Sequence, residues 1–233
     1  MLLVMAGFAH AQDAPEIIED NDTSPYHIAL LDYKAGKYQE AYDVMAPFNQ
    51  GSAPSNPVQF YVLESKVLTE LKRYEEGEKL LHSLLTPTGP LEVQLALGDL
   101  LLRKRSFDRA AKYYDLALQA KPADPDITLK LIYAKIGSAD LVTAGELASH
   151  LMPFDPKNPY DAHASYYFAK AALAQATGRT ADADEDIESA RTFYGITVTD
   201  RYLKTYLEFF SSSTSAVNTD ITPAPLITPA PSH

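Results

Sequence analysis

The sequence predicts an all-α protein, an α-solenoid of about five stacked helix-turn-helix repeats that ends in a C-terminal capping helix. Three observations favour this fold class. A short motif recurs along the chain, apolar residues between its copies fall at helical spacings, and proline or polar clusters separate the units. Because a single hairpin cannot bury its apolar face alone, several units must stack to form a continuous core.

The recurring motif sets the repeat period. It begins with an aromatic or other residue that follows a polar turn, and three positions later a small residue, Ala or Gly, stands in every copy. The first residues of the copies are Tyr38, Tyr74, Phe107, Leu141 and Thr180. The intervals between them are 36, 33, 34 and 39 residues, which indicates an insertion before the last unit. The predicted units are Thr23–Phe48, Pro57–Leu85, Pro90–Ala120, Asp124–Met152 and Tyr160–Tyr194.

The third unit gives the clearest pair of helices. A row of leucines at helical spacings predicts the first helix over 91–104. The second helix is expected over 107–120, with Ser106 as its candidate N-cap. Pro122 and Pro125 follow and should end it, because proline cannot continue a helix.

Small residues alternate with aromatic ones in this unit. Gly98, Ala110 and Ala117 would let neighbouring helices cross closely, and the rings of Phe107 and Tyr114 would fill the space that small side chains leave. The unit closely resembles a tetratricopeptide repeat of the kind found in exported bacterial proteins. The residues that carry the resemblance are Leu97, Gly98, Leu101, Phe107, Ala110, Tyr114, Ala117 and Pro122.

The resemblance extends over residues 23–194, although the match is specific only in the third unit. Ala29 and Ser65 replace the glycine of the first helix in units one and two, and unit four lacks the aromatic residue of the second helix. The tetratricopeptide-like α-solenoid is therefore expected to span residues 23–211 once the capping helix is included.

The capping helix is predicted over Asp200–Ser211 and should end at the serine run that follows. It is apolar on more than one face, through Tyr202, Leu203, Tyr206, Leu207, Phe209 and Phe210. One face should pack on unit five, and the other could support a dimer, close the groove or receive the tail. Residues 212–233 form a Pro/Thr/Ser-rich tail, in which Thr-Pro-Ala-Pro occurs twice, and are expected to be disordered.

The N-terminal residues predict export. An apolar run followed by Ala9-His10-Ala11 is typical of a signal peptide over residues 1–11, although no Lys or Arg precedes the run. Residues 12–22 then read as an acidic linker. We expect a periplasmic protein, or a cytoplasmic one if the leader is not cleaved.

Composition excludes several classes of function. The net charge of −11 over 233 residues repels phosphate backbones and argues against nucleic-acid binding. The absence of cysteine excludes disulfides, thiol catalysis and cysteine-based zinc sites. No apolar run approaches the roughly 20 residues that span a bilayer, so no membrane span is expected.

No catalytic, cofactor or metal site is predicted. The six histidines include no His-Glu-x-x-His pattern that would place two zinc ligands on one helix face. The acidic run from Asp182 to Glu188 lacks the Gly and Glu that a calcium loop needs at its sixth and twelfth positions, where Ile187 and Phe193 stand. A non-enzymatic protein without cofactors is expected.

The resemblance implies that the first helices of the hairpins line a concave groove for a partner protein or peptide. Projection of that face gives an apolar and aromatic set with three charged residues. The candidate residues are Tyr26, Leu30, Tyr33, Val62, Leu63, Lys66, Leu95, Asp99, Leu102, Leu129, Lys130, Tyr133 and Phe168. Some relatives clamp a carboxylate with Lys, Asn and Arg, but the corresponding residues here are Tyr26, Leu30, Leu63, Glu92 and Ala96. The groove is therefore expected to prefer apolar segments.

The sequence as a whole favours a protein–protein interaction scaffold or adaptor. It would bind an apolar extended or helical segment of a partner, with aromatic anchors supplying affinity, in the assembly of an envelope complex. The alternative is a self-associating structural protein that forms a homodimer through the apolar capping helix.

Overall fold

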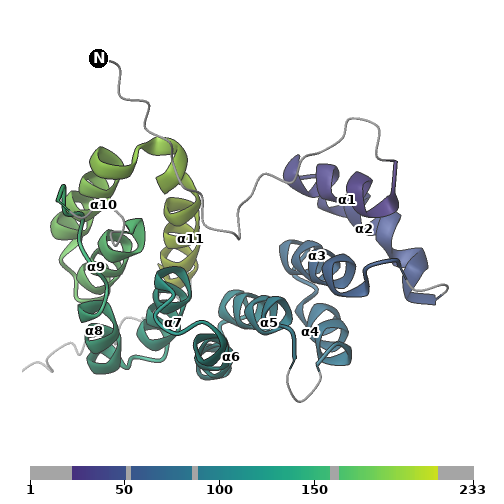
Figure 1. Ribbon diagram of the computed structural model, residues 1–233, viewed down its shortest axis with the longest axis horizontal. Coiled ribbons are helices and arrows are strands. Elements are labelled where there is room, and N and C mark those ends of the chain that lie inside the picture. The colour runs from purple at the N-terminus through teal and green to yellow at the C-terminus, as the bar shows by residue number, and fades with distance from the viewer. Residues whose placement is uncertain (1–22, 51–53, 86–88, 158–162, 215–233) are drawn as a thin grey trace, which may run out of the picture. The chain divides into compact units, whose positions relative to one another are not determined.

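In the computed structural model, the described residues are 23–50, 54–85, 89–157 and 163–214 (Figure 1). Within these ranges the chain forms eleven α-helices and one short 3-10 helix, and no strand. The predicted leader (1–11), the acidic linker (12–22) and residues 215–233 of the predicted tail lie outside the described residues.

The helices follow one another as hairpins, as the sequence predicts. The pairs are α1 (Pro25–Lys34) with α2 (Tyr38–Met45), α3 (Pro57–Glu70) with α4 (Tyr74–Ser83), α5 (Leu91–Arg103) with α6 (Phe107–Ala120), α7 (Pro125–Gly137) with α8 (Leu141–Ser149), and α9 (Ala164–Ala176) with α10 (Thr180–Tyr194). A 3-10 helix (Ala46–Gln50) follows α2, and α11 (Ile196–Thr214) ends the series. The first residue of each motif copy is the first residue of a second helix, so the predicted repeat period is confirmed.

All five hairpin turns share one backbone conformation. A residue with a positive φ stands two positions before each second helix, at Gly36, Lys72, Arg105, Ala139 and Gly178. The N–H of the next residue then donates to a carbonyl five residues back, as Arg73 does to Leu68 at 2.8 Å. This is the Schellman arrangement, which satisfies carbonyls left over at a helix end. Three of the five positions are not glycine, so the hydrogen bonds and not the residue type define the turn.

The chain divides into two compact units, residues 1–73 with α1 to α3 and residues 74–233 with α4 to α11. In the first unit, α1 and α2 pack together and against α3 around a core that includes Ala29, Met45 and Phe60. Ala29 and Ser65, the residues that replace the repeat glycine, are both buried, which shows that this unit packs with slightly larger residues at those positions.

In the second unit, each helix packs on its neighbours in the chain, and α7 also contacts α5 and α9. The first helices therefore lie side by side. The predicted close crossings are confirmed, because a Cβ on Gly98 would lie 2.5 Å from the buried Tyr114 ring. The ring of Phe107 lies in the same way against Gly137 of α7. Aromatic rings thus fill the space that glycines leave in α5 and α7.

Ser106 occupies the predicted N-cap position of α6, although its side chain makes no capping hydrogen bond. One detail of the prediction is wrong. The last helix is longer than predicted, since it begins at Ile196, directly after Gly195, and continues through the serine run to Thr214. Serine is a moderate helix former, and it does not break a helix that is anchored along its preceding turns.

None of the helices in the described ranges is both long and apolar enough to cross a bilayer.

Candidate partner-binding surface

The first compact unit presents most of its candidate residues at the surface. Tyr26, Leu30 and Tyr33 lie on α1, one turn apart, and each packs against the core while part of its side chain stays exposed. On α3, Val62 is half-buried and Lys66 is exposed, but Leu63 is buried in the core. The predicted face therefore exists on this unit as a row of partly exposed aromatic and aliphatic side chains with one cation.

Helix α1 exposes more apolar surface than the sequence analysis anticipated. Ile28 and Leu31 are 40% and 45% exposed, on the side of α1 away from Ala29, which is fully buried. Ile28 and Leu31 lie one turn apart on the side of α1 opposite Tyr26, Leu30 and Tyr33, and exposed aliphatic residues of this kind are common at sites that bind other proteins. The signal was present in the sequence as an unbroken apolar run, Ile28-Ala29-Leu30-Leu31.

In the second compact unit, most candidate residues are buried. Leu102 and Leu129 are at most 8% exposed, Tyr133 is 1% exposed and Phe168 is fully buried. In this structure these four side chains pack within the protein. The pattern of apolar residues along a helix identifies its apolar face but not what covers that face. Here other parts of the chain cover it.

Leu95, Asp99 and Lys130 of the same set remain partly exposed. The two charged residues are paired with one another, because Lys130 Nζ lies 2.9 Å from a carboxylate oxygen of Asp99. The other oxygen of Asp99 accepts a hydrogen bond of 2.8 Å from the Tyr114 hydroxyl. Burial raises the pKa of Tyr114 well above its ordinary value, and the negative charge of Asp99 adds to this effect. The pair thus links α5, α6 and α7 and presents a polar strip beside Leu95.

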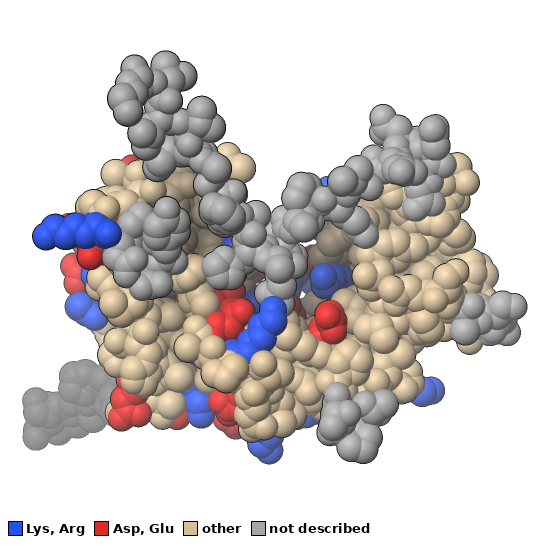
Figure 2. Space-filling view, viewed as in Figure 1, with Lys and Arg blue, Asp and Glu red and all other residues tan. Residues whose placement is uncertain are grey.

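On the face drawn in Figure 2, charged side chains of the described residues are scattered and do not gather into one large patch of either sign. Most of that face carries neither acidic nor basic side chains.

Two of the buried candidates of the second unit, Tyr133 and Phe168, lie beneath α11. Like the first helix of a further hairpin, α11 packs on α9 and α10 (Figure 1). It also reaches back to the preceding hairpins. Phe209 lies 5.1 Å from Tyr133 of α7 and 5.9 Å from Phe107 of α6, measured between ring centroids. Tyr202 stacks on Phe168 of α9 at 5.4 Å. The chain's own last helix therefore occupies the face of α7 and α9 that the sequence analysis assigned to a partner.

A polar cluster at the start of α7 holds the first turns of α11. The carboxylate of Asp126 accepts hydrogen bonds from the hydroxyls of Tyr202 at 2.6 Å and Ser165 at 2.7 Å. Arg201 forms an ion pair with the same carboxylate at 3.2 Å. Nearer the other end of α11, Glu208 pairs with Arg103 of α5. The docked helix is thus fixed by an acid–base pair near each end of its aromatic row.

Asp126 and Arg103 were not among the predicted site residues. Asp126 stands in the first turn of a helix, where an acid favours the positive end of the helix dipole, and Arg103 stands in the last turn, where a base does. Because the helix dipole already accounts for both residues, their contacts with α11 cannot be inferred from their positions in α7 and α5. Only the matching charges at Arg201 and Glu208, seven residues apart on one face of the last helix, could have indicated the pairing.

One polar atom is unsatisfied in this interface. The hydroxyl of Tyr133 is buried and has no hydrogen-bond partner in the described part of the chain. Burial raises the pKa of Tyr133 far above its ordinary value, and the neighbouring Tyr206 and Tyr202 of α11 add to this effect. A buried donor without an acceptor is rare in folded proteins, because it has lost its hydrogen bond to water.

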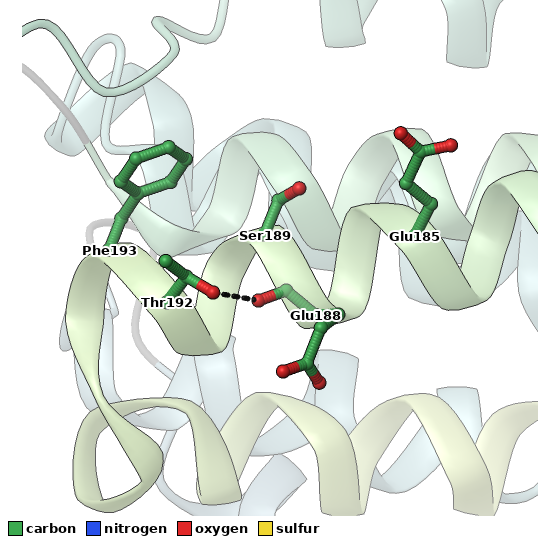
Figure 3. Close-up of a pocket in the computed structure, with 5 residues that line it drawn as sticks. All are labelled: Glu185, Glu188, Ser189, Thr192 and Phe193. Carbon is green, nitrogen blue, oxygen red and sulfur yellow. Dashed lines mark hydrogen bonds between the residues drawn. The ribbon is translucent and has the colours of Figure 1, made fainter.

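Two surface hollows lie on the last hairpin. One, of about 180 Å³, is formed entirely by α10 side chains, including Glu185, Ser189 and Phe193, and is shown in Figure 3. The other, of about 460 Å³, lies between α9 and α10 beside the ion pair of Lys170 with Asp186. No group of three or more His, Asp or Glu within the described ranges is arranged to hold a metal ion.

Comparisons with known proteins agree with the helical-repeat architecture. The structure aligns with TTC0263, a thermophilic TPR protein of Thermus thermophilus, at a TM-score of 0.56 and 15% identity, over 78% of this chain and 97% of that one. It aligns with a putative kinesin light chain of Podosopora anserina, which has nearly identical TPR-like repeats, at a TM-score of 0.54 and 18% identity, over 72% and 92%. The chain matches no protein-family model.

One curated protein is similar in sequence. The human protein O-mannosyl-transferase TMTC1 is 29% identical over 111 residues, which are 46% of this chain. The match spans only 12% of that protein's length. Together with the helix order, the structural alignments establish the class of this chain as an all-α solenoid of tetratricopeptide-like hairpins with a C-terminal capping helix.

Proposed function

We propose that this protein is a non-enzymatic interaction scaffold that binds an apolar extended or helical segment of another protein. The observation that carries the proposal is the apolar surface of α1, where Ile28 and Leu31 are 40% and 45% exposed on one side and Tyr26, Leu30 and Tyr33 stay partly exposed on the other. Partly exposed aromatic residues give a large contact area at a small entropic cost, and they often anchor protein interfaces. The tetratricopeptide-like fold supports a protein as the partner.

The experiment is affinity capture with the full chain, tagged at its C-terminus, from the cells that produce it, read by mass spectrometry. A parallel bait carries Leu31→Asp, which places one negative charge on a 45% exposed leucine of α1. Tyr133 would be a poor choice for such a variant, because it is buried and its replacement would act on the core.

The matched control is Leu116→Asp on α6, which places the same charge on a 43% exposed leucine of a second helix. We expect a partner that the wild-type chain and the control recover and that the α1 variant loses. Equal recovery by all three baits would show that this face does not bind.

Export and a role in the assembly of an envelope complex belong to the same proposal. They are supported by the Ala9-His10-Ala11 pattern that follows an apolar run in the sequence. N-terminal sequencing of the captured bait tests export directly. A mature chain that starts at Gln12 in a periplasmic fraction supports it, and an intact Met1 in the cytoplasm contradicts it.

Self-association is the second candidate, because the outer side of α11 carries exposed apolar residues. Ile196 and Leu207 are 64% and 54% exposed. A second copy that covered them would give a dimer whose population rises with concentration. Sedimentation of the wild-type chain and of Leu207→Asp decides between the candidates, since only a dimer of this kind is lost in the variant.

A further inference from the structure

Helix α11 occupies its binding face as a ligand would. It runs in the same direction as α7, because Asp126 contacts Tyr202, and Tyr133 contacts Phe209, at the same separation of 76 residues in the sequence. The buried residues Tyr202, Tyr206 and Phe209 form one row with helical spacings of four and three. Such a row is the usual way in which an amphipathic helix binds in a groove.

The contacts are specific in charge as well as in shape. Arg201 precedes the first aromatic residue of the row and pairs with Asp126, and Glu208 precedes the last one and pairs with Arg103. Reversal of the helix would bring the base near Arg103 and the acid near Asp126. The face therefore selects an aromatic helix of one orientation.

The fit of α11 is nevertheless incomplete. The Tyr133 hydroxyl is buried with no hydrogen-bond partner in the described part of the chain, while the Tyr133 ring contacts Phe209 of α11. A helix that offered an acceptor at this place would gain a hydrogen bond that α11 does not make. A helix that makes this hydrogen bond should therefore compete successfully with α11 for the face.

The way in which α11 is connected to the rest of the chain allows another helix to take its place. Only Gly195 separates α10 from α11, and beyond α11 no further described element packs over it. The outer side of α11 is exposed at Leu207, so the helix is covered on one side only. Elements with one buried side and one connection open at lower free energy than those inside a stack.

We propose that the face of α7 and α9 beneath α11 is a second binding site, which takes a helix of another protein in place of α11. The incoming helix has aromatic residues at spacings of four and three, a base before the first, an acid before the last, and an acceptor facing Tyr133. The proposal rests on the proposed scaffold function and adds a partner class and a mechanism of closure, in which α11 keeps the site filled until such a helix arrives.

The test uses a fluorescent peptide of residues 196–214 and the purified full chain, followed by fluorescence anisotropy. The peptide should bind weakly to the wild-type chain, because the tethered α11 competes with it at high effective concentration. It should bind at least about 10-fold more tightly to a chain carrying Tyr202→Ala and Phe209→Ala, since these changes loosen α11 and leave the face intact.

Two controls make the outcome specific. Asp126→Asn added to the loosened chain removes the carboxylate that faces Arg201 and should reduce binding again. In the otherwise wild-type chain, Tyr133→Phe removes the unsatisfied hydroxyl, so α11 should bind more firmly, exchange its amide hydrogens more slowly and admit less peptide.

If the loosened chain keeps its helical circular dichroism but binds no peptide, α11 is an integral cap and the proposal is wrong. If the wild-type chain forms dimers through exchanged copies of α11, the occupant is a second copy, and a foreign helix is excluded. Neither outcome bears on the capture experiment at α1, so this proposal and the scaffold proposal can fail separately.

Discussion

At the scale of single residues, the structure depends on places where only a hydrogen atom fits. Gly98 faces the Tyr114 ring, which is fully buried and is also held by its hydroxyl to Asp99. Gly145 of α8, by contrast, has open space around it. The two glycines lie in the same class of element, so they separate the effect of crowding from the effect of backbone entropy.

We therefore expect Gly98→Ala to lower the free energy of unfolding by about 1–3 kcal/mol, because the buried ring must move. Gly145→Ala should raise it by about 0.5–1 kcal/mol, since alanine is the better helix former. Urea unfolding followed by circular dichroism measures both. Equal effects of the two changes would mean that the Tyr114 ring adapts without strain.

The tyrosines of α11 predict a loss of stability at alkaline pH. Burial raises the pKa of Tyr206 to about 12, and the charge of Asp184 adds to this effect. Burial and the charge of Asp126 raise the pKa of Tyr202 to about 12 as well. In the unfolded chain a tyrosine titrates near about 10. The contribution to stability is therefore complete below about pH 10 and is lost as the pH rises toward about 12.

Urea midpoints measured across this alkaline range should fall less steeply in Tyr206→Phe than in the wild type, because the variant has one fewer group that must stay protonated to keep the fold. At neutral pH the two proteins should differ little in this respect. Parallel curves for the two proteins would show that Tyr206 titrates equally in the folded and unfolded chain.

At the scale of the secondary-structure elements, the hairpin turns are the most regular feature. Gly178 and Ala139 occupy the same left-handed position in their turns, with φ values of 78° and 63°. Side chains other than glycine are strained in this region, because the Cβ approaches the following carbonyl oxygen. The same left-handed conformation is thus strained at Ala139 and free of strain at Gly178.

Replacing Gly by Ala at one position and Ala by Gly at the other should change the stability in opposite directions. Gly178→Ala should cost about 1 kcal/mol, and Ala139→Gly should stabilise by up to about 1 kcal/mol. Thermal unfolding of the two variants against the wild type checks the signs. A loss of stability in both would mean that the methyl group of Ala139 makes a contact worth more than the strain.

The repeats could be read from the sequence because their information is local. Tyr38, Phe107 and Leu141 each follow a short polar turn and begin a helix, so period and boundaries were correct to within a few residues. The docking of α11 could not be read in the same way. The pattern of Tyr202, Tyr206 and Phe209 shows an apolar row, but which surface covers it depends on how far the preceding hairpins bring α7 beneath it. Tyr133 and Phe168 were correctly placed on first helices, because that information is local. Their burial beneath α11 was not predicted, because it depends on tertiary packing.

At the scale of the whole molecule, stability should be distributed rather than global. Neighbouring hairpins contact one another, as in other repeat proteins whose stability is a sum of local terms. The chain also divides into two compact units with separate cores. Damage to one core should therefore not spread evenly through the chain.

Two matched variants test this expectation. Phe60→Ala and Phe168→Ala each remove a nearly fully buried ring, from the first and the second unit, at a cost of about 3–5 kcal/mol. Hydrogen exchange followed by mass spectrometry should show faster exchange mainly in α1–α3 for the first variant and mainly in α7–α11 for the second. A uniform increase in both variants would indicate one cooperative unit.

The contact of Glu208 with Arg103 has a consequence for how such a gene can lengthen. Repeat arrays grow by duplication of a hairpin, and most positions in an array tolerate the insertion because each unit contacts only its neighbours. Here α11 spans from α9 back to the end of α5, so a hairpin duplicated between α6 and α10 would move α11 away from Arg103 and Phe107. Longer homologues should carry their additional hairpins on the N-terminal side of α5, and the segment from α5 to α11 should keep a nearly constant length.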